Sequence, residues 1–316
     1  MSNEAAAFNL FGLNVYTYGL FLSLACILSG ILLIFRSQKS ETQKNAAALS
    51  CLLSPILGLA FSRAVFVLFE VNFAPFLSFK NVFNLHTGGL SMFGALIGTV
   101  LGAVIAAKVS RIKVLNWLDL LIPSVFLFIA AARLGEGFTT LGISRPLVTD
   151  VLKNTFLAFH DEYDAYLRTF LLEGFTAAIL SVLSILYHMK HKKSGYTMMY
   201  GALMFGTTQT LFESLRFDAH LRFSFIGLQQ LLSVLLFTGV LLYLSIQSIR
   251  QKKHTALAVL TLCLIPLVLA AILGIEFMID RSQINKWFSY LLYILVLAVP
   301  VILGLVLLEK KRGTNG

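Results

Sequence analysis

The positive charge of this chain follows a regular pattern that few folds tolerate. Of its 25 Lys and Arg residues, 15 form five short clusters, and each cluster closes an apolar stretch. The clusters come after every second stretch. Short loops rich in Lys and Arg stay on the cytoplasmic side of a membrane. The pattern therefore predicts a multi-span membrane topology, and its clusters are Arg36/Lys39/Lys44, Lys108/Arg111/Lys113, Lys190/Lys192/Lys193, Arg250/Lys252/Lys253 and Lys310/Lys311/Arg312.

Nine stretches are apolar enough to be spanning helices, which need about 20 mainly apolar residues. The chain is 58% hydrophobic and 13% charged, about half the charge of a soluble domain. With the N-terminus outside, all five clusters lie inside. We therefore predict an all-α polytopic membrane protein with about nine transmembrane helices, an outer N-terminus and a cytoplasmic C-terminus. The spans lie near Leu13–Phe35, Ala46–Glu70, Gly88–Lys108, Trp117–Arg133, Phe170–Met189, Tyr196–Phe212, Ile226–Ile249, Thr255–Met278 and Trp287–Leu308.

The spans divide into a body and an appendage. We predict a seven-helix membrane body over residues 1–250 and two additional C-terminal helices over 251–316, which follow a basic linker. Residues 255–308 are a candidate contact for a membrane partner. Of the outer loops, 71–87 has the composition of an interfacial segment. The loop 134–169 is long enough to favour a functional role.

Several function classes are disfavoured. The net charge of +10 comes mostly from the loop clusters, so it does not indicate nucleic-acid binding. The three cysteines lie inside apolar stretches without paired spacing, which predicts neither a disulfide framework nor a thiolate metal site. The segment His160–Asp164 is interpreted as a solvated acidic turn rather than a metal site. We expect no metal and no cofactor.

Six charged residues have no role in topology. A charge inside a membrane helix costs several kcal/mol, so it usually faces the bundle interior and has a partner. We expect these six to converge on one cavity open to the outer leaflet. A spacing of three residues lets Glu213 pair with Arg216, and Arg133 with Glu136. Structural ion pairs remain one interpretation, and an anion site for a phospholipid headgroup is the other, because arginine matches phosphate. The six are Arg63, Arg133, Glu136, Glu173, Glu213 and Arg216.

A ladder of glycines opens the third span. Gly94, Gly98 and Gly102 recur every four residues and form a stripe on one helix face. Such a stripe lets two helix backbones approach closely. Taken alone, the ladder predicts tight helix packing.

The same block resembles the bacterial prolipoprotein diacylglyceryl transferase family. Residues Gly88–Gly98 resemble the motif GGLSFHGGLIG of that family, and Ala132–Glu136 resemble the start of its GRxGNFxNxE signature. The order and spacing of the fragments hold over roughly residues 12–247, outside the last two spans. The family has seven spans with an outer N-terminus. Further similar fragments are Tyr18–Leu20, Ser62–Leu68, Leu172–Gly174, Phe212–Asp218 and Gln230–Ser233.

This resemblance implies a reaction. Such enzymes move the diacylglyceryl group of phosphatidylglycerol to the thiol of a lipobox Cys in a secreted precursor. Glycerol phosphate leaves, and no metal or cofactor takes part. By position, Arg133 would hold the headgroup, while Glu213 and Arg216 would orient it or its leaving oxygen. The resemblance thus implies catalytic roles for Arg133, Glu213 and Arg216, and substrate contacts for Tyr18, Arg63, Gly88, Gly89, Ser91, Glu136, Glu173, Gln209 and Gln230.

The chain also departs from the family pattern. A His, a Tyr and an Arg of the family are replaced by Phe93, Phe205 and Gln209, so a base, a hydroxyl and a cation are missing together. Glu136 replaces an Asn, and Leu141 a Glu. His86 lies two helical turns before Phe93 and is a weak substitute. We expect a divergent enzyme acting on a phospholipid at the outer face of the plasma membrane. The alternative is a catalytically inactive relative that binds lipid or assists assembly, and a transporter is the third hypothesis.

Overall fold

The computed structural model describes residues 6–10, 13–69, 89–139, 142–146, 153–191, 193–217, 222–223, 225–282 and 286–310. The predicted interfacial segment 71–87, Gly88, His86 and Leu141 lie outside these residues. The chain forms two compact units, residues 1–141 with 177–198, and residues 142–176 with 199–316. This division follows spatial contacts. The predicted boundary near residue 250 stays a prediction.

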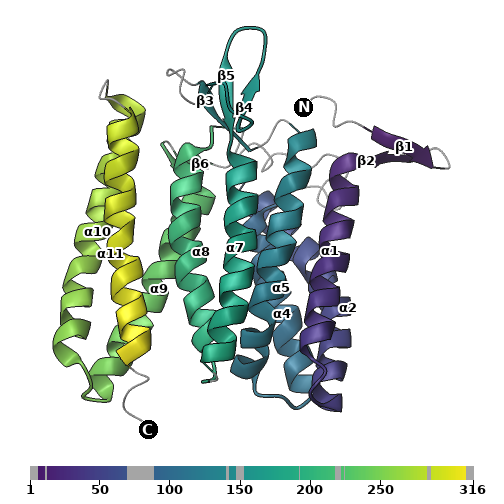
Figure 1. Ribbon diagram of the computed structural model, residues 1–316, viewed down its shortest axis with the longest axis vertical. Helices are drawn as coiled ribbons and strands as arrows, with labels where there is room; N and C mark the ends of the chain where they lie inside the picture. The colour runs from purple at the N-terminus through teal and green to yellow at the C-terminus, as the bar shows by residue number, and fades with distance from the viewer. Residues whose placement is uncertain are drawn as a thin grey trace. The chain divides into compact units, whose positions relative to one another are not determined.

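Unit 1 is a bundle of antiparallel helices preceded by a hairpin. The strands β1 and β2 pair antiparallel directly before the first helix. Helix α2 packs on α4, and α1 packs on α5 (Figure 1). Membrane helices satisfy their backbone hydrogen bonds internally, which is why long apolar runs adopt this form. The elements are β1 (Ala6–Leu10), β2 (Leu13–Tyr16), α1 (Thr17–Arg36), α2 (Glu41–Phe69), α4 (Met92–Val109), α5 (Val114–Gly135), η3 (Glu136–Phe138) and the second part of α7 (Thr169–Lys190).

The predicted glycine ladder joins α2 to α4. A Cβ added to Gly98 would lie 2.1 Å from the backbone oxygen of Leu57, and one added to Gly94 would lie 2.5 Å from that of Phe61. A Cβ on Gly102 would meet the backbone of Ser54 at 2.9 Å. The packing interpretation of this ladder is therefore confirmed.

Unit 2 holds the remaining helices and a small sheet. Helices α9, α10 and α11 pack on one another, and Figure 1 shows α10 and α11 running side by side. Their core includes Leu203, Phe237, Ile272 and Leu297. The elements are β3 (Ile143–Pro146), β4 (Ala158–His160), β5 (Ala165–Arg168), the start of α7, most of α8 (Tyr196–Leu215), β6 (Arg222–Phe223), β7 (Ile226–Gly227), α9 (Leu228–Arg250), α10 (Thr255–Arg281) and α11 (Lys286–Lys310).

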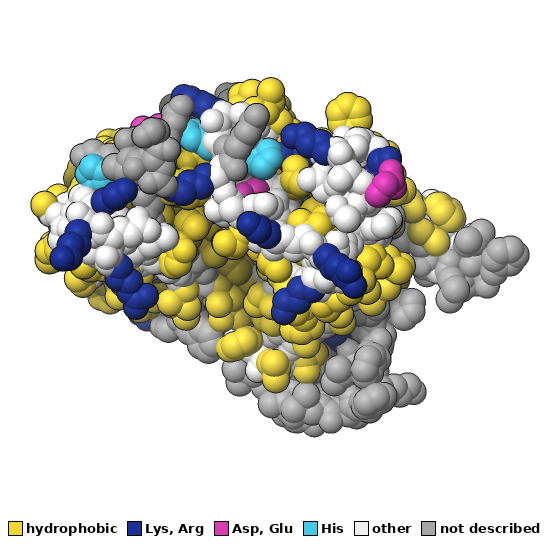
Figure 2. Space-filling model, turned by 90° about the horizontal axis from the view of Figure 1, so that it is seen from below, with side chains coloured by type: hydrophobic (Ala, Val, Ile, Leu, Met, Phe, Trp, Pro, Cys, Tyr) yellow, Lys and Arg dark blue, Asp and Glu magenta, His cyan; other side chains and the backbone are white. Residues whose placement is uncertain are grey.

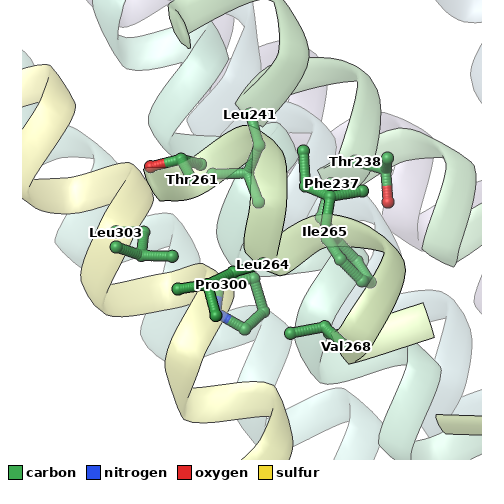
Figure 3. Close-up of a pocket in the computed structure, with 9 residues that line it drawn as sticks. All are labelled: Phe237, Thr238, Leu241, Thr261, Leu264, Ile265, Val268, Pro300 and Leu303. Atoms are coloured by element: carbon green, nitrogen blue, oxygen red, sulfur yellow. The ribbon is translucent and has the colours of Figure 1, made fainter. Parts of the chain in front are cut away.

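A small cavity interrupts the apolar packing of α9, α10 and α11. Its volume is about 10 Å³, close to the minimum that a single water molecule requires. Figure 3 shows side chains of all three helices around it, including Thr238, Thr261 and Pro300. The cavity is too small for a lipid and holds none of the predicted site residues.

Eight helices in the described part of the chain are long and apolar enough to cross a membrane. The prediction of a polytopic all-α membrane protein is confirmed, but the count of nine apolar spans is not. Helix α8 is the ninth long helix and falls short of the apolar criterion. It carries Thr207, Gln209, Thr210 and Glu213, all of them buried. A helix shielded by protein tolerates such side chains because they face partners rather than lipid.

The first residues of three basic clusters stand at helix ends, as predicted. Arg36, Lys108 and Arg250 lie in the last turns of α1, α4 and α9. The face seen from below in Figure 2 carries Lys and Arg side chains beside hydrophobic ones. Positive charge there also suits the negative end of each helix dipole. The outer position of the N-terminus stays a prediction.

The loop predicted over 134–169 contains a small three-stranded β-sheet. Its strand order is β3–β5–β4, with antiparallel pairs. Along β5 the side chains alternate between buried and half-buried, the period of a strand with one covered face. The acidic segment is the exposed turn between β4 and β5, as predicted. Asp161 accepts hydrogen bonds from the backbone N–H groups of Asp164 and Tyr163, which hold the pKa of its carboxyl below the usual value.

Candidate functional site

Arg133 and Glu136 form a buried ion pair in unit 1, as their spacing predicted. Arg133 ends α5 and is 6% exposed, and Glu136 opens the 3-10 turn that follows and is 5% exposed. The Nη1 atom of Arg133 donates to Oε1 of Glu136. Its Nη2 atom contacts the Met92 sulfur at 3.0 Å. A guanidinium has five N–H donors, so one carboxylate does not exhaust it.

The predicted residues Tyr18, Arg63, Gly89 and Ser91 lie on neighbouring elements of the same unit. A Cβ on Gly135 would be 3.2 Å from the ring of Tyr18, so this tyrosine packs beside the end of α5. Arg63 is buried, and its Nη1 donates to the backbone oxygen of Gly89 at 3.0 Å. Ser91 caps α4 by accepting from the N–H of Gly94.

Gly89 has a backbone conformation that favours glycine. Its φ of +77° lies in the left-handed region, which L side chains rarely adopt. A Cβ there would also fall 2.4 Å from the Phe66 ring and 2.8 Å from Arg63. The glycine therefore allows the backbone to come close to the buried arginine.

A second polar network occupies unit 2. Arg216 is 1% exposed, and its Nη1 donates to Oε1 of Glu173 at 3.2 Å. Gln209 donates from Nε2 to Glu173 at 3.1 Å and to Glu213 at 3.0 Å. One amide therefore joins a carboxylate of α7 to a carboxylate of α8. The network brings together four of the predicted residues, and Glu173 is one partner of Arg216. The expected pairing of Glu213 with Arg216 stays a prediction.

The sheet holds the backbone of Arg216 in place. Arg216 follows the last residue of α8 and forms an antiparallel bridge with Ser144 of β3. The N–H of Phe217 donates to the backbone oxygen of Ile143 at 2.9 Å. The guanidinium of Arg145 lies 4.5 Å from the centre of the Phe217 ring. The loop between α5 and α7 thus positions the cation of the second network.

Gln230 lies in the seventh span and was predicted to contact substrate. It hydrogen-bonds to the two helices that lie outside the predicted seven-helix body. Its Nε2 donates to Glu276 of α10, and to the Tyr293 hydroxyl of α11 at 3.0 Å. All three side chains are buried. Glu276 was not among the predicted site residues, because the last two spans were interpreted as an appendage. The signal was present, since Glu276 is a charge within an apolar span.

Asp119 was also missed. It is 2% exposed, and its two carboxylate oxygens accept from the backbone N–H groups of Gly195 at 2.6 Å and Met198 at 2.8 Å. These groups belong to the start of α8. Asp119 therefore caps a helix from outside, which is a structural role, and its charge within the fourth span was the available signal.

The side chains at the positions where the resemblance implies a His, a Tyr and an Arg are buried. Phe93 and Phe205 are 7% and 5% exposed and add no proton-transfer group. Gln209 contributes an amide that joins two carboxylates. The expectation that Arg133 and Arg216 face one outward cavity links the two units and stays a prediction, as do the catalytic roles. Among the described residues, no group of three or more His, Cys, Asp or Glu side chains is arranged to hold a metal ion.

Known proteins are similar to the part of the chain that contains both polar networks. The family model described as prolipoprotein diacylglyceryl transferase matches residues 5–246. A phosphatidylglycerol–prolipoprotein diacylglyceryl transferase of Finegoldia magna is 24% identical over 258 residues, which cover 79% of this chain and 97% of that protein. The phosphatidylglycerol–prolipoprotein diacylglyceryl transferase 1 of Clostridium perfringens is 26% identical over 260 residues, which cover 78% of this chain and 96% of that protein.

A protein of the same name from Chloroflexus aggregans is 31% identical over 143 residues. That match covers 44% of this chain and 46% of the relative. Helices α10 and α11 lie beyond the family match. Because the family model spans most of the chain, including both polar networks, the chain belongs to the prolipoprotein diacylglyceryl transferase family, a family of transferases of the bacterial plasma membrane.

Proposed function

We propose that the chain is an active, divergent diacylglyceryl transferase. Its donor is phosphatidylglycerol or a related phospholipid, and its acceptor is the thiol of a lipobox Cys in a secreted precursor at the outer face of the membrane. The names of its relatives supply phosphatidylglycerol and a prolipoprotein, and the resemblance stated above supplies the Cys thiol. The observation that carries the proposal is the fully buried Arg216 within the network of Glu173, Gln209 and Glu213.

The chemical step has a simple balance. The thiol sulfur attacks the glyceryl carbon that bears the phosphate ester, and a C–S bond forms as the C–O bond breaks. The phosphate oxygen takes the electron pair and leaves as glycerol phosphate. The thiol proton passes to a base. The site must therefore supply positive charge at the phosphate and an acceptor for one proton.

The two networks contain both kinds of group. The planar guanidinium of arginine matches the geometry of a phosphate and stays charged when buried, so Arg216 is assigned to the phosphate that leaves. Arg133 is assigned to the headgroup in the same way. We assign Glu213 as the proton acceptor, because Phe93 leaves no imidazole at the family position and Gln209 holds the Glu213 carboxylate in place.

A catalytically inactive, lipid-binding relative is the second candidate. The buried Phe93 and Phe205 favour it, because two family groups capable of proton transfer are absent together. Both candidates retain the buried arginines and predict lipid binding. They differ in whether a thioether forms.

The deciding experiment uses the purified full chain in liposomes containing phosphatidylglycerol, with a lipobox peptide as acceptor. Mass spectrometry detects the diacylglyceryl peptide. We expect product from the parent and at least a hundredfold less from Glu213→Gln, the lower end of a typical general-base contribution. Arg133→Gln is expected to weaken phosphatidylglycerol binding.

The matched control is Glu41→Gln. Glu41 also pairs with a cation, Lys44, but on the exposed start of α2. This variant should retain parental activity. Retained phosphatidylglycerol without any thioether would replace the transferase proposal by the lipid-binding one. Equal rates for Glu213→Gln and the parent would remove Glu213 from the role of base.

A further inference from the structure

The interface between α9 and the two helices beyond the family match contains a buried polar cluster. Gln230 is 3% exposed, Glu276 is 5% exposed and Tyr293 is 0% exposed. Both Nε2 hydrogen bonds of Gln230 go to the added helices, one to the Glu276 carboxylate and one to the Tyr293 hydroxyl. The surrounding contacts are apolar, with Phe237, Ile272 and Leu297 among them.

A buried polar cluster stabilises helix packing less efficiently than apolar contacts do. A carboxylate inside a membrane bundle costs several kcal/mol, and apolar side chains of similar volume often replace buried charges without loss of stability. The neighbouring packing shows that α10 and α11 can bind α9 through apolar contacts. A role beyond adhesion is therefore the better explanation for Glu276.

The cluster adjoins the second polar network. A Cβ placed on Gly227 would lie 3.7 Å from Oε2 of Glu213 and 3.8 Å from Cβ of Gln230. The Glu213 carboxylate and the Gln230 side chain thus flank the same glycine. Helix α11 makes a second contact there, because the hydroxyl of Tyr290, one turn before Tyr293, donates to the backbone oxygen of Ser214 at 3.2 Å.

The two hydrogen bonds also fix which way the amide of Gln230 points. Its Nε2 has two hydrogens, and two acceptors take them. The Oε1 atom of Gln230 is then turned away from Glu276 and Tyr293. It accepts no hydrogen bond from the residues that the structure describes. An oriented amide oxygen recognises a hydroxyl or N–H donor. The headgroup of phosphatidylglycerol carries two hydroxyls.

We propose that Glu276 and Tyr293 are positioning residues that orient Gln230 toward a hydroxyl of the lipid headgroup, so that α10 and α11 complete the site. The inference rests on the proposed function. It makes the added helices part of substrate recognition and gives the buried carboxylate a role that adhesion does not explain.

The test measures kcat and KM of full-length variants in liposomes of phosphatidylglycerol diluted in phosphatidylcholine. Glu276→Leu and Tyr293→Phe each remove one acceptor. Each should raise KM for phosphatidylglycerol about five- to tenfold, the equivalent of one net hydrogen bond, with a smaller change in kcat. Glu276→Gln keeps an acceptor oxygen and should remain within about twofold of the parent. Thr261→Val is the control, because Thr261 is buried on α10 and, among the described residues, its hydroxyl hydrogen-bonds to Leu257 of the same helix.

A purely structural role gives a different result. The thermal midpoint would then fall in parallel with activity, whereas we expect Glu276→Leu to keep or raise it. If Glu276→Leu does not fold, Tyr293→Phe decides the matter, because it removes a single oxygen. Parental KM in both variants overturns the inference.

Lipid retention separates this inference from the proposed function. Native mass spectrometry measures phosphatidylglycerol held by the purified protein against phosphatidylethanolamine. If the parent makes no thioether, the transferase proposal fails, while a preference for phosphatidylglycerol that Glu276→Leu loses and Glu276→Gln keeps still supports the inference. A parent without that preference, or a Glu276→Leu variant that keeps it, overturns the inference.

Discussion

The contact between α2 and α4 allows a quantitative prediction at Gly98. An added Cβ would lie 2.1 Å from the Leu57 oxygen and 2.7 Å from the Gly58 nitrogen, while ordinary contacts begin at 3.4 Å. The obstacle is backbone, so no side-chain rotation relieves it. The two helices would have to separate locally by about 1.3 Å, the difference between 3.4 and 2.1 Å.

The expected magnitude combines two opposing effects. Overpacking by one methyl group costs about 1–3 kcal/mol, and a rigid obstacle favours the upper end. Replacing glycine by alanine inside a helix stabilises the protein by about 1 kcal/mol, because alanine has less conformational entropy in the unfolded chain and a higher helix propensity. Gly98→Ala should therefore lower the free energy of unfolding by about 2 kcal/mol.

Gly239→Ala and Gly274→Ala are matched controls. Both glycines lie inside helices, and an added Cβ meets nothing within 4 Å at either. They should be neutral or stabilise by up to about 1 kcal/mol. The contrast between Gly98→Ala and these controls is then about 3 kcal/mol.

The measurement is equilibrium unfolding in mixed micelles with a rising fraction of SDS, followed by helical circular dichroism. The fluorescence of Trp117 gives a second signal, because its indole N–H is buried and donates to Ser50 of α2. If Gly98→Ala unfolds at the same SDS fraction as Gly274→Ala, the close approach of α2 and α4 does not hold in the protein.

Three further predictions concern charged groups. Asp119→Asn should destabilise the protein by about 1–3 kcal/mol, because its amide turns a donor toward one of two backbone N–H groups; thermal unfolding beside Asp119→Ala checks it. Glu136→Gln alone should destabilise the protein more than the double variant Arg133→Met with Glu136→Gln, because the single variant leaves a buried guanidinium without its carboxylate. A double-mutant cycle measures this coupling. The turn held by Asp161 should keep its protection above the unfolded carboxyl pKa and lose it as the pH falls through the lower folded pKa, while Asp161→Asn removes this dependence; hydrogen exchange at Tyr163 and Asp164 reports it.

The helices and their ends were predictable from local pattern. Apolar runs and basic clusters fall where α1, α4 and α9 end, because hydropathy and charge act residue by residue on insertion into a membrane. The pair Arg133–Glu136 and the glycine ladder were also predictable. Both depend on spacings of three or four residues on one helix.

The sheet β3–β5–β4 was not predictable in this way. Its strands are short, and they carry too few residues for alternation to stand out from a loop. Ser144 shows the consequence, since it joins the sheet to Arg216, 72 positions later in the chain. Such a pairing leaves no periodic signal.

What the sequence alone determined is that the chain crosses a membrane many times and keeps a few costly charges inside. What only the tertiary structure decided is which groups those charges meet. Arg216 binds Glu173, Asp119 caps a distant helix, and Gln230 turns to Glu276. The physical reason is that transfer into lipid is a local, additive property of each segment, whereas the partner of a buried charge is chosen by how separate helices pack.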